Sequence, residues 1–156
     1  MLRLVTVFGS PYLGVYCTAN ERYALVAEGA EPSFVEDIEQ VLKVEVVRTY
    51  IAGSTLVGSL VAMNSNGMVV TNFAEKQELA KLPKDLRVGV MEEKLNAAGN
   101  NIVANDKAAF VHPAASRFSL RAIEDALGVE VHRGSIVGME TVGSVCLATS
   151  TGVVGH

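Results

Sequence analysis

Two closely similar segments recur within the chain, and this internal repeat limits the folds open to it. The segment 38–53, IEQVLKVEVVRTYIAG, resembles the segment 123–138, IEDALGVEVHRGSIVG, at a constant spacing of 85 positions. Both have Ile, Glu, Leu, Val-Glu-Val, Arg, Ile and Gly at corresponding places. A fixed period decides an architecture before any single element is assigned. The chain is therefore predicted to consist of copies of one module.

Intermediate copies show that the true period is about half of that spacing. A glycine followed six residues later by a small polar residue occurs four times, as Gly14 with Asn20, Gly58 with Asn64, Gly99 with Asn105, and Gly143 with Thr149. Successive glycines are 44, 41 and 44 residues apart. We therefore expect one domain, 1–156, with modules of about 43 residues. The expected repeats are 1–47, 48–90, 91–132 and a partial fourth, 133–156.

Each module is predicted to begin with a β-hairpin. In the second unit, the apolar stretch Leu60–Met63 is followed by the polar turn Asn64–Gly67 and by a second apolar stretch, Met68–Val70. The third unit repeats this pattern around Asn105. Two short apolar stretches around an Asn-rich turn are typical of a hairpin.

A helix and a third strand are predicted after each hairpin. In the first unit Ser33 has Glu36 three residues later, the spacing of a capping box, so Ser33 is the expected N-cap. Apolar residues at helical spacing then define one face, comprising Phe34, Ile38, Val41 and Leu42. The third unit has the same pattern at Leu120, Ile123, Ala126 and Leu127, and the second unit a shorter version around Glu75–Leu82, stopped by Pro83. The strands that follow are expected at 44–47, 86–90 and 129–132.

The module is thus strand, strand, helix, strand, and it is too small to bury its apolar face alone. Neighbouring copies must cover one another. Radial packing around a central axis, with sheets inside and helices outside, also shields strand edges. The predicted fold class is a pseudo-symmetric α/β propeller of ββαβ repeats.

Composition and charge exclude several functional classes. Hydrophobic residues make up 49% of the chain, but no apolar run approaches the roughly 18 residues of a membrane span, and the N-terminus does not resemble a secretory signal. The formal net charge is −4, and the 13 Lys and Arg residues are scattered. Neither a membrane nor DNA is an expected partner, whereas a mildly acidic body suits a basic protein surface.

No residue pattern indicates a catalytic or metal site. Cys17 and Cys146 lie in apolar segments without CxxC spacing, as expected of small buried side chains in a reducing compartment. His112, His132 and His156 have no local metal-ligand spacing. The repeat glycines form no phosphate-binding motif, and we assign them to tight turns at the start of each hairpin. No cofactor is expected.

Several uncommon strings resemble one known family. Thr49–Gly58, Met63–Val70 and Ala98–Lys107 are closely similar to the archaeal form of the translation initiation factor 6 family. The resemblance extends in the same order over the whole chain, and it includes Phe8–Val15 and Leu127–Val131.

The resemblance implies a pentein fold, a five-fold α/β propeller, and a cytoplasmic protein without catalytic activity. It implies binding to the large ribosomal subunit through a ribosomal protein of the intersubunit face, exclusion of the small subunit, and a role in large-subunit biogenesis. One departure is length, since five modules need roughly 215 residues and the chain has 156. Either the sequence is a fragment or the protein is naturally truncated. An incomplete ring is expected, with self-association through its open strand edges.

Residues at the repeated turns are the candidates for ribosome binding. Asparagine suits such turns for purely structural reasons, because it tolerates a left-handed backbone conformation and its side chain forms hydrogen bonds to nearby backbone groups. Loops on one face of a propeller also commonly bind partners. The candidate set is Gly14, Ser59, Asn64, Asn66, Asn105 and Asp106. The alternative function is that of guanidine-modifying pentein enzymes, which share the implied fold and need an activated cysteine nucleophile.

Overall fold

A computed structural model describes residues 3–155 and contains four small sheets. Three sheets have three strands each, in the orders β1-β2-β3, β4-β5-β6 and β7-β8-β9, and the fourth is the pair β10-β11. The first two strands of each sheet are antiparallel, and the third strand of each complete sheet is parallel to the second. The strands are β1 (Cys17–Ala19), β2 (Tyr23–Ala27), β3 (Glu45–Thr49), β4 (Val61–Met63), β5 (Gly67–Thr71), β6 (Arg87–Met91), β7 (Ile102–Ala104), β8 (Ala108–Val111), β9 (Glu130–Arg133), β10 (Cys146–Ala148) and β11 (Val153–Gly155).

The helices are of two kinds. Those between the second and third strands provide the crossover that parallel pairing requires, and they are α2 (Pro32–Leu42), α4 (Lys76–Leu79) and α6 (Arg117–Leu127). The others precede the first strand of each unit and, like α4, have four residues each. They are α1 (Leu13–Tyr16), α3 (Val57–Leu60), α5 (Ala98–Asn101) and α7 (Val142–Val145). The predicted ββαβ order is confirmed, and the short leading helices are an addition to it. The predicted repeat boundaries remain a prediction.

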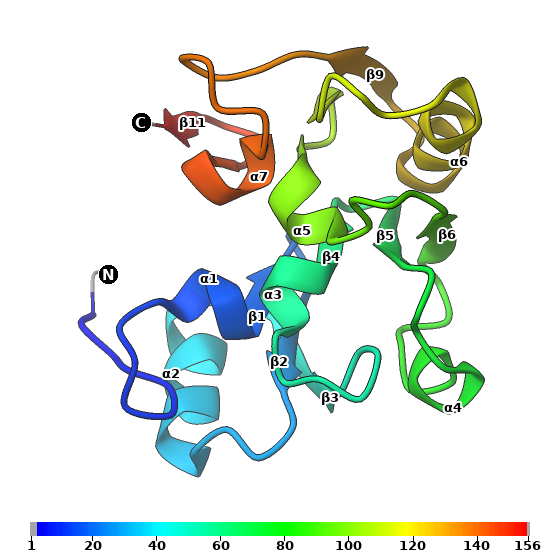
Figure 1. Ribbon diagram of the computed structural model, residues 1–156. Helices are drawn as coiled ribbons and strands as arrows, with labels where there is room; N and C mark the ends of the chain where they lie inside the picture. Colours follow the sequence, from blue (N-terminus) through cyan, green and yellow to red (C-terminus); the bar gives the residue numbers. More distant parts are fainter. Residues whose placement is uncertain (1–2, 156) are drawn as a thin grey trace.

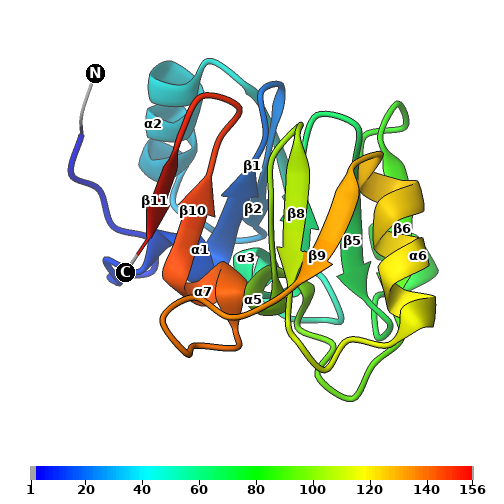
Figure 2. The ribbon, with the colours of Figure 1, turned by 90° about the horizontal axis from the view of Figure 1, so that it is seen from above.

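The units lie around an axis. Figure 1 shows α1, α3, α5 and α7 following one another along a central curve, with α2, α4 and α6 at the periphery. Figure 2 shows that the inner strands run from these short helices towards the hairpin turns at the opposite end of the molecule. The peripheral helices were expected, whereas the helices beside the axis were not. The pseudo-symmetric propeller is thus confirmed as an incomplete ring.

The crossover helices α4 and α6 pack between neighbouring sheets, so both faces of some strands are buried. On β5, Val69 contributes to the cluster that includes Ile123 of α6, while Met68 and Val70 contribute to a cluster with Leu25 of the first sheet. All five residues of β5 are accordingly buried. Full burial of one such apolar side chain stabilises the fold by about 1.5–3 kcal/mol. Packing between units is therefore a main source of stability, as the small size of the module predicts.

The helix starts and faces differ in part from the predictions. The Ser33 capping box is wrong, because α2 already begins at Pro32, whose missing N–H costs nothing in the first turn, and no side chain caps this helix. In α4 the capping box is present, between Glu75 and Glu78. In α6 the Ser116 hydroxyl accepts a bond from the Ser119 amide.

The predicted apolar face of α2 is only partly buried. Phe34 and Ile38 lie in the core, but Val41 is half-buried and Leu42 is 47% exposed. Val41 and Leu42 line a cleft that residues of all four units border. Within residues 3–155, no helix combines the length and the apolar character needed to cross a membrane.

Candidate partner-binding site around the axis

Glycines bring the short helices into close contact beside the axis. A Cβ atom on Gly58 would lie 2.1 Å from the Gly14 carbonyl oxygen, one on Gly99 would lie 1.9 Å from that of Gly58, and one on Gly143 would lie 2.0 Å from that of Gly99. These distances are far shorter than van der Waals contact, so only glycine fits at positions 58, 99 and 143. None of the four glycines has a positive φ. The assignment of these glycines to tight turns is therefore wrong, and close approach between units is the physical reason for them.

At the other end of the inner strands, asparagines link each unit to the next. The Asn20 side-chain amide donates to the Asn64 carbonyl at 2.8 Å, that of Asn64 donates to the Asn105 carbonyl at 3.1 Å, and that of Asn105 donates to the Thr149 carbonyl at 3.1 Å. We call this series the asparagine ladder. It runs in one direction around the axis and fixes the relative positions of the hairpin turns.

The same asparagines also shape their own turns. The side-chain oxygen of Asn64 accepts bonds from the amides of Asn66 and Gly67, at 3.0 and 3.1 Å, and Asn20 and Asn105 repeat the arrangement. In the fourth unit Thr149 keeps this acceptor role through Oγ1, at 3.1 Å from the Gly152 amide. Threonine has no side-chain amide, so the asparagine ladder ends at this unit.

A carboxylate at the next position joins three units. Asp106 accepts bonds from the Ser65 amide and hydroxyl, both at 2.8 Å, and from the Ser150 hydroxyl at 3.0 Å. Desolvation raises the pKa of Asp106, but the bonds from Ser65 and Ser150 outweigh it and leave the pKa below its usual range. The Ser150 hydroxyl also lies 2.9 Å from the carboxylate of Glu21, which belongs to the first unit. Each of the four units thus contributes the residue after its ladder position.

The structure separates the six predicted contact residues into two groups. Asn64, Asn66, Asn105 and Asp106 lie together at the hairpin turns, whereas Gly14 and Ser59 lie in the short helices at the other end of the inner strands. Asn64 is only 3% exposed, and both Asn64 and Asn66 donate to the Leu127 carbonyl at 2.9 Å. Their side chains therefore hold the fold together.

The predicted set misses three residues that lie beside it. Glu21, Ser65 and Ser150 are the neighbours of Asp106 at the hairpin-turn end, and Glu21 is exposed. A signal was present in the sequence, because each of them directly follows the small polar residue of its repeat. We call Glu21, Ser65, Asp106 and Ser150 the turn-end cluster.

A cleft of about 680 Å³ extends along the axis and is lined by residues of all four units. Its lining includes Cys17 and Cys146, and both are free thiols. Burial raises the pKa of Cys17 to about 11, and its thiol lies 3.3 Å from the Leu13 carbonyl. Burial also raises the pKa of Cys146. Neither thiol has the lowered pKa of an activated nucleophile.

His112 and His132 have hydrogen-bonding or ionic partners other than these thiols, and His156 lies outside the described residues. His112 accepts a bond from the Ala114 amide at Nδ1, and its Nε2 lies 3.3 Å from the Glu140 carboxylate. His132 lies 3.7 Å from a Glu130 oxygen. Among the described residues, 3–155, no three His, Cys, Asp or Glu side chains are arranged to hold a metal ion.

A comparison with solved structures supports the fold. An amidinotransferase from Microseira wollei, from the saxitoxin biosynthetic pathway, matches with a TM-score of 0.53 over 81% of this chain and 42% of that chain. At 11% sequence identity, the likeness shows the fold alone. The predicted pentein-type fold is confirmed by it.

Curated relatives match over most of the chain. Translation initiation factor 6 of Methanocella arvoryzae is 40% identical over 152 residues, which is 97% of this chain and 69% of that protein. The protein of the same name from Methanosarcina mazei is 38% identical over 100% of this chain and 71% of its own length, and that of Natronomonas pharaonis 44% over 92% and 66%. These names denote translation factors and no reaction, which supports the prediction that the chain is not an enzyme. The model of the eIF-6 family matches residues 2–156, and the chain belongs to this family.

Proposed function

We propose that this protein is a translation initiation factor that binds the large ribosomal subunit and prevents it from joining the small subunit. It binds through a ribosomal protein of the intersubunit face, acts in the cytoplasm and takes part in large-subunit biogenesis. The observation that carries the proposal is the family match over residues 2–156, together with relatives named translation initiation factor 6.

A blocking factor acts by occupancy, and the structure suits that mode of action. The asparagine ladder and the close contacts of Gly58, Gly99 and Gly143 hold the units in one arrangement. A body that is ordered before binding loses little conformational entropy when it binds. To block joining, the protein then needs only affinity for the large subunit and enough size to fill the contact surface, and no chemical step is needed.

Within the candidate set, the hairpin-turn end is the better contact surface. Asp106 and Glu21 place two carboxylates there, beside the exposed basic side chains of Arg22 and Lys107, and the chain as a whole has a net charge of −4. Negative charge complements a basic ribosomal protein and accelerates association. Gly14 and Ser59, at the other end, are left as secondary candidates.

Sedimentation with isolated ribosomal subunits tests this function. The protein is mixed separately with large and small subunits, and its distribution is followed through a density gradient. We expect it to migrate with the large subunit only. Migration with the small subunit, or with neither, would contradict the proposal.

Because the fold is similar to that of an amidinotransferase, one enzymatic alternative should be tested. A guanidine-modifying enzyme would need an activated thiol, and burial gives Cys17 the opposite property. Turnover of arginine-like substrates that disappears when the cysteines are alkylated would favour the enzyme. We expect no turnover in this assay.

A further inference from the structure

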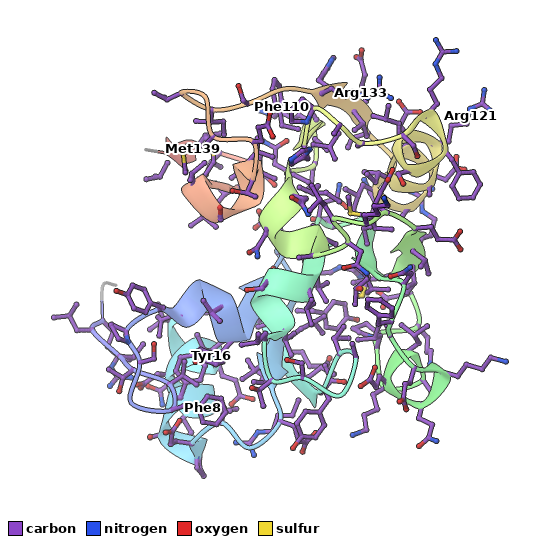
Figure 3. All side chains as sticks on the ribbon, viewed as in Figure 1. Phe8, Tyr16, Phe110, Arg121, Arg133 and Met139 are labelled. Atoms are coloured by element: carbon purple, nitrogen blue, oxygen red, sulfur yellow. The ribbon has the colours of Figure 1, made fainter. Side chains whose placement is uncertain are left out.

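The outward face of α6 carries four charges in an unusual order. Two cations, Arg117 and Arg121, lie in the first half of the helix. Two anions, Glu124 and Asp125, lie in its last turn. The four side chains are exposed and share about a third of the helix circumference. Phe118, which is 66% exposed, lies at the edge of the same face. Figure 3 shows Arg121 directed away from the body of the molecule.

This order of charges opposes the helix dipole. Anions are favoured near the N-terminus of a helix and cations near its C-terminus, whereas α6 has no acidic residue in its first turn and no basic residue in its last. The Glu93 carboxylate offsets part of the effect, because it accepts a bond from the Ser116 amide at 2.7 Å. Helix stability therefore does not explain the charges of α6, and such departures from local preference are expected at functional surfaces.

The four charges have no ionic partner within the described part of the chain. Among residues 3–155, none of them forms an ion pair. Glu124 and Asp125 follow Arg121 by three and four residues, but a base that precedes an acid is the weaker order for pairing along a helix. All four charges are thus available to a partner molecule.

The exposure of this face does not depend on the open side of the ring. Ile123 and Leu127 of α6 pack between the second and third sheets, and both of these sheets are complete. The helix α4 lies between the complete first and second sheets. Its residues Lys76 and Gln77 follow the N-cap as the first two residues of α6 do, and they are exposed as well. The outer side of a crossover helix therefore faces solvent even between two complete units.

The order of charges makes this face complementary to itself. When two copies of α6 lie antiparallel, the basic half of each faces the acidic half of the other. A two-fold axis near position 122 places Arg117 opposite the partner's Asp125, and Arg121 opposite the partner's Glu124. The best axes for these two pairs differ by only about 2 Å along the helix, a distance that the long arginine side chains span.

We infer that the outward face of α6 is the contact surface of a symmetric dimer with a second copy of this chain. Arginine–carboxylate pairs link the copies in both directions, and Phe118 adds apolar area at the edge. One helix face buries less than the roughly 1,200 Å² of a standard interface, so the dimer is weak and sensitive to salt. Because α6 runs between the two ends of the molecule, the two hairpin-turn ends point in opposite directions and both stay accessible.

Sedimentation equilibrium of the whole protein at low salt, at concentrations up to about 1 mM, tests the dimer with two charge-swapped variants. Arg117→Glu with Arg121→Glu makes the face wholly acidic, and Glu124→Arg with Asp125→Arg makes it wholly basic. Each variant alone should stay monomeric because like charges repel, whereas an equimolar mixture should form a heterodimer. Both variants follow the preference of the helix dipole, so both should remain folded, as circular dichroism will show.

A matched control changes the same charge elsewhere. Glu36→Arg with Glu39→Arg adds the same positive charge to exposed positions of α2, and this variant should dimerise as the unmodified protein does. Raising the salt concentration should dissociate the dimer. An unmodified protein that stays monomeric throughout, or a mixture of the swapped variants that fails to associate, would overturn the inference. Association that persists in each swapped variant alone would also overturn it, because the contact would then lie elsewhere, as at the strand edges.

Discussion

Single residues at the axis set how closely the units approach. Sequence periodicity identified the positions Gly14, Gly58, Gly99 and Gly143 correctly and gave the wrong reason for them. The spacing of a glycine along the chain cannot show which carbonyl lies against its Cα in space. In the structure that neighbour is the carbonyl of the preceding unit's glycine. Gly14 differs, because nothing lies within 4 Å of the Cβ atom that it would carry.

Gly99→Ala should therefore be far more damaging than Gly14→Ala. The new methyl group at position 99 would lie 1.9 Å from a backbone oxygen, which cannot move without shifting α3. We expect the free energy of unfolding, measured by urea denaturation, to fall by about 3 kcal/mol or more. Gly14→Ala should change it by less than about 0.5 kcal/mol. Equal losses in the two variants would show that the contact between short helices is not what selects glycine.

Carboxylates that accept hydrogen bonds from backbone amides also stabilise the fold, and Glu78, which accepts from the Ala52 and Gly53 amides, is an example. The folded pKa of Glu78 is lowered from an ordinary value of 4.5. An ionised Glu78 therefore stabilises the fold fully above a pH of about 4.5, and this stabilisation is lost as the pH falls through the folded pKa. No sequence pattern predicts this bond, because the turn at Ala52 and Gly53 lies 25 or 26 residues before its partner.

Glu78→Gln should lower the free energy of unfolding at neutral pH by about 1.5–3 kcal/mol, the range for hydrogen bonds to a charged group. The difference from the unmodified protein should shrink as the pH is lowered below 4.5, because the native side chain is then protonated as well. Urea denaturation at a series of pH values measures both quantities. A difference that stays constant with pH would contradict a role for the charge of Glu78.

At the scale of elements, sequence predicted type and order well and boundaries less well. The apolar spacing of Ile123 and Leu127 located α6, and two apolar stretches around the polar turn at Asn105 located β7 and β8. The start of α2 was misplaced because Ser33 and Glu36 have capping-box spacing, while Pro32 fixes the backbone one residue earlier. The short helices before the first strands (α1, α3, α5 and α7) escaped detection because one turn is too short to show helical periodicity.

The two helix starts predict effects of different size for the same substitution. Ser116→Ala removes the acceptor of the Ser119 amide and should lower the free energy of unfolding by about 1 kcal/mol. Ser33→Ala removes no capping bond in the uncapped α2 and should change it by less than about 0.5 kcal/mol. Urea denaturation of both variants provides the comparison. A larger loss for Ser33→Ala would contradict the observed start of α2.

At the scale of the whole molecule, the repeat was sufficient to predict the fold, but not the contacts between units. Copies of a small module must cover one another, and this argument led to the propeller. The site depends on contacts between units, such as those of Asp106 with Ser65 and Ser150, which lie 41 and 44 residues away. Such contacts leave no local pattern. The predicted asparagines also join the units, and their contact with a partner stays a prediction.

Charge at the hairpin-turn end should matter for binding to the large subunit. Glu21→Lys reverses an exposed charge in the turn-end cluster and should weaken binding by roughly five-fold, which corresponds to about 1 kcal/mol. Glu92→Lys makes the same change in net charge at an exposed position after β6, at the end of the short helices. It should bind as the unmodified protein does. Sedimentation at a series of protein concentrations measures both affinities, and equal weakening would place the contact elsewhere.

Joining of purified subunits, followed by light scattering, tests the central claim most directly. Large subunits are first incubated with the protein and then mixed with small subunits under conditions that favour association. We predict that joining decreases in proportion to the large subunits occupied, and that prior incubation of small subunits alone has no such effect. Normal joining when every large subunit carries the protein would contradict a mechanism based on occupancy.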